Sequence, residues 1–375
     1  MTLAANTLAF AIAFAAWVAL GPAARSLGAE LGLGDGDLAW MRALPILVGA
    51  TLRLPMGVLT DHLGARITFP ALLWIGSAAM VWLSLSTGLP TALLSATALG
   101  AVGATFAVGV QSVSAATPSA RHGVALGVFG AANIGSALTT FGMPLLLGLT
   151  DWRGAMQLYA AVLAATGVAY AVAVRGVPCG AASLATRLAP LRHPASWRFG
   201  LYYMATFGAF VAVTLVANDL YIDAHGLSPT AAGAMATTFT VSSSLARIPG
   251  GWLADRLGGA RVLRWALALV GLALAPLGQV GGLAPTVGLV FLSGLAMGVG
   301  MAAVYQLIPD RFPTAVGAAG GVVGSLGGLA GFYLPLVGSW LGRPLLPVGL
   351  LAATALATHL LWDGQVSPRP RSLRS

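Results

Sequence analysis

Twelve long apolar runs, separated by short polar or Pro/Gly-rich breaks, dominate this sequence. A helix needs roughly 20 apolar residues to cross the hydrocarbon core of a bilayer, so each run is long enough for one span. Strands of a membrane β-barrel would alternate polar and apolar residues instead. The pattern predicts an all-α membrane protein with spans at about 3–24, 38–60, 67–86, 91–116, 123–149, 155–174, 199–219, 229–254, 262–279, 283–308, 315–341 and 345–362.

The composition excludes a soluble globular fold. Charged residues make up only 8% of the 375 residues, against roughly 25% in soluble domains. The 50 glycines suit transmembrane helices that pack closely through small residues. The spans use most of the chain, so we expect no large domain outside the membrane. With Cys179 as the single cysteine, we expect neither a disulfide framework nor a thiol metal site, and no cofactor.

The charges predict how the chain is oriented in a membrane. All 19 basic residues are arginine and only ten residues are acidic, which gives a net charge of +9. The arginines are scattered over short loops without interleaved aromatic residues, so we expect no nucleic-acid binding. With the N-terminus inside, thirteen arginines fall in cytoplasmic segments and three, Arg25, Arg153 and Arg343, in outer loops. This bias predicts a multi-pass plasma (inner) membrane protein with both termini in the cytoplasm.

An internal repeat divides the chain into two halves. Residues 53–64 and 247–258 share seven identities at an offset of 194. The same offset relates Gly127 to Gly321 and Gly130 to Gly324. Each half has an even number of spans, so the repeats are parallel and related by an axis along the membrane normal. We predict two pseudo-symmetric six-helix bundles, with the first bundle at 1–175, a cytoplasmic linker at 176–198 and the second bundle with a short tail at 199–375.

Two arginines lie inside apolar spans at equivalent positions. A charge at the bilayer centre costs at least about 2.5–3.5 kcal/mol and usually faces a cavity or a partner. Arg53 and Arg247 each precede a loop acid, Asp61 or Asp255, by eight residues, about 12 Å of helix. No acidic residue lies in the middle of any predicted span. Either the arginines reach the headgroups or bond backbone carbonyls, or they form a symmetric anion site.

The choice of arginine favours a planar oxyanion as the ligand. The guanidinium fork meets two oxygens in one plane, whereas an ammonium group acts as a point charge. Two facing positive charges are costly when the site is empty. We therefore expect a bound monoanion to let the halves close and the empty carrier to close poorly.

Further candidates surround this pair. The Gly-Xaa-Leu-Xaa-Asp pattern at 57–61 and 251–255 is followed by basic residues. The acid and the basic residues either clamp neighbouring helix ends together in one conformation or are ordinary surface charges. Glycine stripes on the fifth and eleventh spans permit sliding or static close packing. Asn133 is the one amide in its span, and aromatic side chains would bound a cavity or simply pack. The gating candidates are Asp61, Arg66, Asp255, Arg256, Gly127, Gly130, Gly324 and Gly328, and the aromatic candidates are Phe106, Tyr203 and Phe207.

The duplicated loop motif and the six-plus-six plan resemble the major facilitator superfamily over essentially the whole chain. Within it, the sequence resembles the nitrate/nitrite porter family in four features taken together. These are the two intramembrane arginines, the fifth span ending Asn133-Ile-Gly135, the eleventh span from Gly321 to Pro335, and Tyr203-Met-Ala-Thr-Phe207 on the seventh.

The resemblance implies a secondary transporter of nitrate and/or nitrite, not an enzyme, that works by alternating access as a monomer in the lipid bilayer. It implies that Arg53 and Arg247 sandwich the anion, and that glycine-rich spans let the halves rock. Hydrogen bonds to the anion would come from Tyr203 and Asn133, and its faces would contact Phe106 and Phe207.

Several alternatives stay open on the sequence alone. Lack of an intramembrane acid favours nitrate/nitrite exchange, but a proton-coupled importer could use His359, Asp223 or His225. A carrier of another small organic or inorganic anion would keep the arginines. A drug exporter or a membrane enzyme would need a polar relay or a nucleophile at mid-depth, and a transport-dead sensor would differ from a carrier only in flux.

Overall fold

The computed structural model describes residues 2–117, 122–174, 189–277, 280–312, 316–343 and 345–362, and these ranges are almost entirely helical. In the first half the crossing segments are α1 (Thr2–Trp17) continued by α2 (Leu20–Leu31), α3 (Asp35–Leu63), α4 (Ala65–Ser84), α5 (Leu89–Leu99) continued by α6 (Thr105–Ala116), α7 (His122–Ala131) continued by α8 (Gly135–Leu149), and α9 (Trp152–Ala173). In the second half they are α11 (Pro194–Tyr203) continued by α12 (Ala209–His225), α13 (Pro229–Leu257), α14 (Gly259–Leu274), α15 (Leu283–Arg311), α16 (Val316–Trp340) and α17 (Leu346–Trp362). The expected twelve-helix architecture is confirmed.

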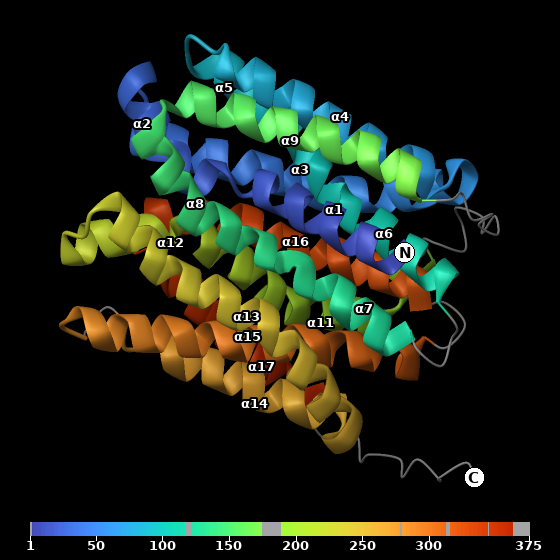
Figure 1. Ribbon diagram of the computed structural model, residues 1–375. Helices are drawn as coiled ribbons and strands as arrows, with labels where there is room; N and C mark the ends of the chain where they lie inside the picture. Colours follow the sequence, from blue (N-terminus) through green and yellow to red (C-terminus); the bar gives the residue numbers. More distant parts are fainter. Residues whose placement is uncertain are drawn as a thin grey trace.

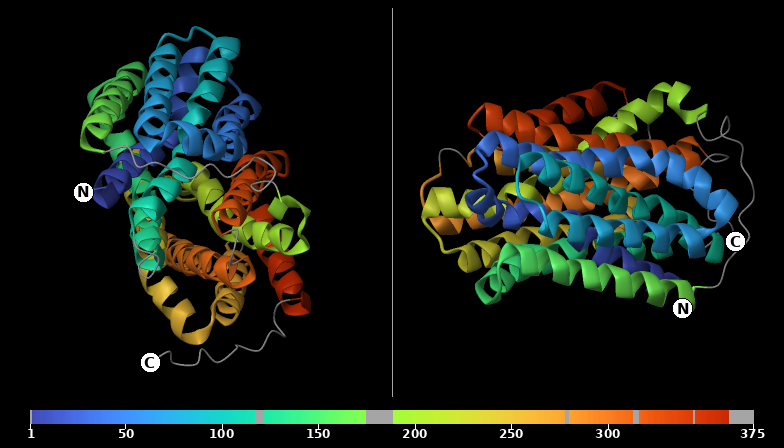
Figure 2. Two further views of the ribbon diagram at one scale, coloured as in Figure 1. Left: turned by 90° about the vertical axis from the view of Figure 1, so that its right-hand side faces the viewer. Right: turned by 90° about the horizontal axis from the view of Figure 1, so that it is seen from above.

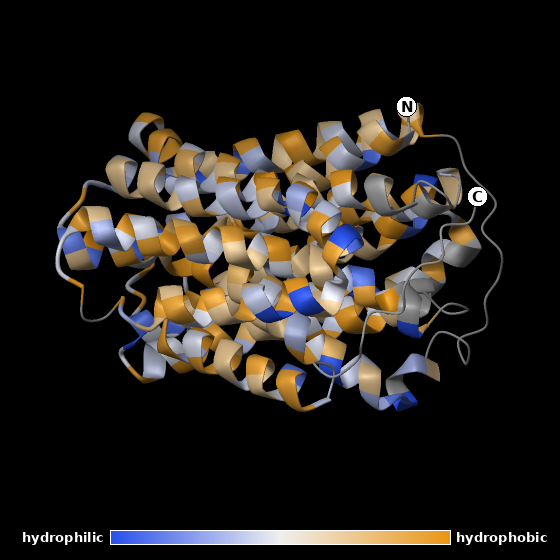
Figure 3. Cartoon of the chain, turned by 90° about the horizontal axis from the view of Figure 1, so that it is seen from below, coloured by the Kyte–Doolittle hydropathy of each residue, from blue (hydrophilic) through white to orange (hydrophobic). Residues whose placement is uncertain are grey.

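The outer surface is that of a membrane protein. Among the described residues, eight helical runs are long and apolar enough to cross a bilayer, and Leu346–Trp362 is a shorter apolar helix. Large apolar side chains such as Trp74, Val172 and Leu272 are exposed on the outside. Figure 3 shows apolar residues along the length of the outer helices. Lipid tails are the environment that stabilises such a surface.

The repeat seen in the sequence recurs in the backbone. Helices α3 and α13 have 29 residues each and coincide end to end under the offset of 194. They end at equivalent glycines with positive φ, Gly64 (77°) and Gly258 (88°), and the preceding crossings end at Gly32 (65°) and Gly226 (62°). Left-handed backbone favours glycine because it has no Cβ. The same residues therefore stop equivalent helices in both halves.

The two halves lie side by side (Figures 1 and 2), and three sets of helix contacts contribute most to the interface between them. Helix α3 packs along α16, α13 packs along α7 and α8, and α2 contacts α12. The first two contacts are equivalent under the repeat. We call the end of the bundle with the α2–α3 turn, residues 32–34, the distal end, and the end with Thr2 the proximal end.

Some boundaries differ from the expected ones. The first crossing continues to Leu31, and the seventh begins at Pro194, where the ring of His193 accepts a hydrogen bond from the Ala195 N–H at 3.1 Å. Polar residues near the ends of spans extend these helices. Several charged residues expected in loops lie on helices instead, among them Arg25, Asp61, Arg153, Asp223 and Asp255. Of the predicted linker, residues up to 188, Cys179 included, lie outside the described ranges, and Ala189–Arg192 form a 3₁₀ turn.

Candidate functional site

Arg53 is held between the two halves. It lies on α3 and is only 2% exposed. Its Nη1 donates to the carbonyl of Gly324 on α16 at 2.6 Å, and its Nε donates to that of Gly103 at 3.4 Å. Within the described residues Nη2 has no partner. Burial without full pairing is costly for a cation, so this N–H group is available to a ligand.

Ring faces surround the Arg53 guanidinium. Its central carbon lies 5.0 Å from the ring centre of Phe207, 5.1 Å from that of Phe106 and 5.7 Å from that of Trp17. Cation–π contacts of this kind are worth up to about 2 kcal/mol when desolvated. These contacts offset part of the cost of burying the cation, and they do so without a carboxylate.

Arg247 makes the equivalent contact with a backbone carbonyl from the opposite half. It is 6% exposed, and its Nη1 donates to the carbonyl of Gly130 on α7 at 2.6 Å. Its Nη2 contacts the Tyr203 hydroxyl at 3.1 Å and the Met301 sulfur at 2.9 Å, and its Nε has no partner in the described part of the chain. Gly130 and Gly324 are equivalent under the repeat. Each arginine therefore reaches the equivalent glycine carbonyl across the interface, as the backbone-carbonyl alternative anticipated.

Four aromatic residues connect the arginines. The rings of Tyr203 and Phe207 stack with centres 5.0 Å apart and an interplanar angle of 11°. Tyr305 meets Tyr203 edge-on at 5.2 Å and Phe106 at 6.4 Å. The contacts thus run from Arg247 through this aromatic cluster, which consists of Phe106, Tyr203, Phe207 and Tyr305, to Arg53.

Asn133 lies on a 3₁₀ turn, Ala132–Ile134, between α7 and α8. Its side chain is fully buried, and neither amide atom has a partner among the described residues. It follows Gly130, the acceptor of Arg247, by one turn. A buried amide left unpaired costs about 1–3 kcal/mol, so its presence calls for an explanation. A polar ligand at this depth would provide one.

The helices that carry the site depart from α-geometry there. Tyr203 ends α11 and leads into a π turn, Met204–Gly208, that contains Phe207. Gly103, an acceptor of Arg53, lies in the 3₁₀ turn Gly100–Ala104. Such interruptions frequently mark functional positions in helices. Here they place ring faces and carbonyls where a regular helix would not.

Three of the four predicted gating glycines touch the arginines. A Cβ added at Gly130 would lie 2.8 Å from Nη1 of Arg247, and one at Gly328 would lie 3.5 Å from Nη1 of Arg53. At Gly324 the added atom would lie 3.2 Å from the Tyr305 hydroxyl. Gly127 has nothing within 4 Å. The first three give room to the guanidinium groups and their neighbours, whereas Gly127 does not contact them.

Comparison with known proteins agrees with this architecture. Residues 7–195 and 198–373 match the family described as Major Facilitator Superfamily. The sequence is 35% identical to "Probable nitrate/nitrite antiporter NarK1" of Thermus thermophilus, over 95% of this chain and 89% of the relative. It is 32% identical to "Nitrite extrusion protein" of Bacillus subtilis (strain 168), over 89% and 85%. The chain belongs to the major facilitator superfamily and, within it, to the nitrate/nitrite porter family.

A solved structure supports the fold of this porter. A bacterial homolog of the human lysosomal transporter Spinster superposes with a TM-score of 0.70, over 96% of this chain and 95% of that one, at 16% sequence identity. At this identity the likeness concerns the fold alone. Two transporters of very different sequence therefore share the same twelve-helix frame.

The proximal gating candidates form no ion pair in the described part of the porter. Arg66 Nε donates to the carbonyl of Ala171 on α9 at 3.1 Å, within the first half. Arg256 lies over the ring of Trp252 at 4.1 Å, and Asp255 is exposed. The side chain of Asp61 is outside the described part. A clamp between these charges stays a prediction.

His359 lies in the last turn of α17 and is packed inside the second half. Its side chain is fully buried, its Nε2 lies 2.8 Å from the carbonyl oxygen of Ala260, and its ring meets Tyr202 edge-on at 5.3 Å. These contacts join α17 to α14 and α11 inside the second half. A proton route through His359 would have to pass through this packed core.

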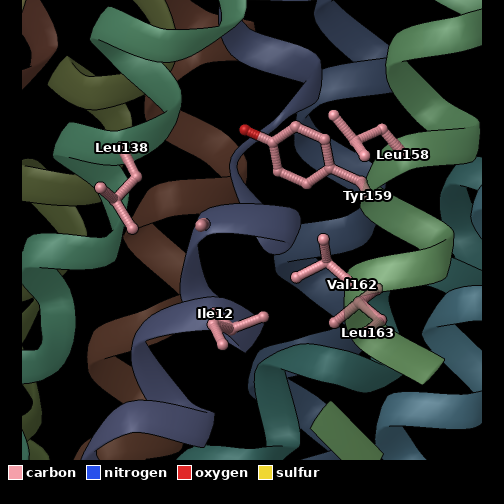
Figure 4. Close-up of a pocket in the computed structure, with 7 residues that line it drawn as sticks. Ile12, Leu138, Leu158, Tyr159, Val162 and Leu163 are labelled. Atoms are coloured by element: carbon pink, nitrogen blue, oxygen red, sulfur yellow. The ribbon is translucent and has the colours of Figure 1, made fainter. Parts of the chain in front are cut away.

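A recess on the surface of the porter is no candidate for anion binding. It lies between α1, α8 and α9, and its walls are almost entirely apolar (Figure 4). The one polar side chain in it, Tyr159, has its hydroxyl 2.9 Å from that of Thr139. Leu138 and Leu158 at its rim are 63% and 50% exposed, as expected for a lipid-facing surface.

Proposed function

We propose that this porter carries nitrate and nitrite by alternating access, with the anion held between Arg53 and Arg247. The observation that carries the proposal is the symmetric pair of buried arginines. Each has an N–H group without a partner, and no carboxylate in the described residues pairs with either. The relatives named as nitrate/nitrite antiporter and nitrite extrusion protein support the choice of anion.

The available donors fit a small planar anion. Arg53 Nη2 and Arg247 Nε are free, and the Asn133 amide is unpaired. Tyr203 accepts from Arg247, and its hydroxyl group can donate to the anion in turn. Phe106 and Phe207, whose ring faces lie against Arg53, would contact the faces of the anion. Hydrogen bonds to charged groups are worth roughly 1.5–3 kcal/mol each, and planar oxygens match the guanidinium fork.

The contacts across the interface favour exchange over net transport. Both arginines bond glycine carbonyls of the opposite half, and these bonds must break before the bundles, 1–175 and 199–375, can rock. A bound anion supplies replacement acceptors and cancels one positive charge. We therefore propose nitrate/nitrite exchange by a monomer in the inner membrane, with the termini in the cytoplasm and the distal end outside. Proton-coupled nitrate import is the alternative.

Uptake of labelled nitrate into proteoliposomes tests this function. Vesicles are preloaded with nitrite, with nitrate or with neither anion, at equal pH and with acid outside. We expect uptake only with an anion inside, and no response to the pH gradient. Uptake into anion-free vesicles that rises with external acid would establish proton symport. Absence of uptake under every condition would contradict the proposal and favour an organic-anion carrier.

A further inference from the structure

An ion-pair cluster joins the two halves at the distal end. Arg25 Nε lies 2.6 Å from Asp219 Oδ1, and Arg42 Nη2 lies 2.5 Å from Asp219 Oδ2. Arg25 Nη2 lies 2.7 Å from Asp223. Both arginines belong to the first half, on α2 and α3, and both acids belong to α12 of the second half. We call these four residues the distal cluster.

Asp219 occupies a position built for a planar oxyanion. Its two carboxylate oxygens each meet a different guanidinium group, so the carboxylate lies between two arginines. The side chains of Arg42 and Asp219 are 11% and 19% exposed, and Nε of Arg42 is buried without a partner in the described residues. Arg25 and Arg42 thus present two guanidinium groups, as Arg53 and Arg247 do, but here the Asp219 carboxylate occupies the place between them.

The cluster lies in line with the central arginines. Arg42 precedes Arg53 by eleven residues on the same helix. Eleven residues correspond to about 16 Å along an α-helix and roughly 20° around it. The two side chains therefore lie on nearly the same face of α3, one toward the distal end and one at the centre.

We propose that Arg25 and Arg42 form an entry site for a planar oxyanion, which Asp219 fills when the distal end is closed. The class of anion rests on the function proposed above. When the halves separate at this end, α12 withdraws its carboxylates and leaves two guanidinium groups uncompensated. An anion from the distal side takes the place of Asp219, offsets this charge and stabilises the open conformation. The anion then moves along the face of α3 to Arg53.

Transport measured separately from each face tests the entry site. Nitrate/nitrite exchange is compared in right-side-out and inside-out membrane vesicles for wild type and for Arg42→Gln. We expect the KM for nitrate supplied from the distal face to rise by about tenfold, whereas the KM from the proximal face stays unchanged. Equal effects on both faces, or no effect, would overturn the proposal.

Replacing Asp219 should change the distal KM in the opposite direction. Asp219→Asn removes the competing charge and nearly keeps the shape, so we expect a lower distal KM for nitrate together with slower exchange. Simple misfolding would not lower a KM. A raised or unchanged distal KM in Asp219→Asn would count against the idea that the carboxylate competes with the anion.

Two further variants make the result specific. Arg153→Gln also removes a distal arginine, but its partner Glu30 lies in the same half, so neither KM should change. Arg53→Lys should impair transport from both faces, because the anion passes Arg53 in either direction. If Arg53→Lys is harmless and Arg42→Gln still acts from one face, the central site fails and the entry site stands.

Discussion

At the scale of single residues, backbone carbonyls and ring faces stabilise the buried arginines in place of carboxylates. An acid beside Arg53 or Arg247 would neutralise it permanently and compete with an anion. A carbonyl and an aromatic face lower the cost of burial and leave the formal charge in place. The result is a cationic centre whose remaining charge a bound anion can neutralise.

Gly130→Ala tests the importance of the carbonyl contact. The new methyl group would lie 2.8 Å from Nη1 of Arg247, so the guanidinium must move off its acceptor. Because a hydrogen bond from a charged group contributes about 1.5–3 kcal/mol, we expect nitrate exchange to slow by about tenfold. The matched variant Gly127→Ala meets nothing within 4 Å and should slow exchange much less. Equal rates in the two variants, measured in proteoliposomes, would contradict this explanation.

The sequence was sufficient to single out the arginines but not all of their neighbours. Arg53 and Arg247 stand out because the repeat pairs them and the apolar spans isolate them. Tyr305 and Met301 have no such signal, because the repeat pairs them with Gln111 and Ala107. Their role depends on how α15 turns toward the interface, which is a tertiary property.

At the scale of elements, the apolar runs predicted every crossing but not the breaks within them. Hydropathy is an average over many residues, so it does not reveal a π turn at Met204–Gly208 or a 3₁₀ turn at Gly100–Ala104. These turns depend on close contacts with other helices. Gly208 approaches α16 so closely that a Cβ there would lie 2.4 Å from the Gly327 carbonyl oxygen and 2.4 Å from the Ala330 Cβ.

Gly208→Ala should therefore destabilise the fold at the π turn. Overpacking of this kind typically costs 1–3 kcal/mol, so we expect thermal unfolding of the detergent-solubilised protein about 5 °C lower. Gly271→Ala on α14, which meets nothing within 4 Å, is the control and should unfold at the wild-type temperature or slightly above. An unshifted unfolding temperature in Gly208→Ala would show that the contact between the π turn and α16 adapts without cost.

At the scale of the whole molecule, the two halves are joined by bonds that belong to one conformation. The distal cluster includes two positions that the repeat makes equivalent, Arg25 and Asp219, 194 residues apart. The sequence did not single out this pair, because each residue resembles an ordinary charge near a span end. Under the repeat, the contact of α3 with α16 is equivalent to the contact of α13 with α7 and α8, so one contact between the halves repeats the other.

Cross-linking the distal end should stop transport. The rings of Trp40 on α3 and Phe332 on α16 lie 6.1 Å apart. We expect a short bifunctional maleimide to join cysteines placed at both positions in a Cys179→Ser background and to abolish exchange, because alternating access requires this end to open. Each single cysteine variant, treated alike, should stay active. Undiminished exchange in the cross-linked protein would rule out opening between α3 and α16.

Equilibrium binding of nitrate to the purified protein tests whether one anion binds between Arg53 and Arg247. Arg53→Lys and Arg247→Lys keep the charge but lose the planar fork, whereas Arg343→Lys is a control far from the site. We expect saturable binding that is weakened at least about tenfold in either central variant and unchanged in the control. Wild-type affinity in Arg53→Lys or in Arg247→Lys would contradict it.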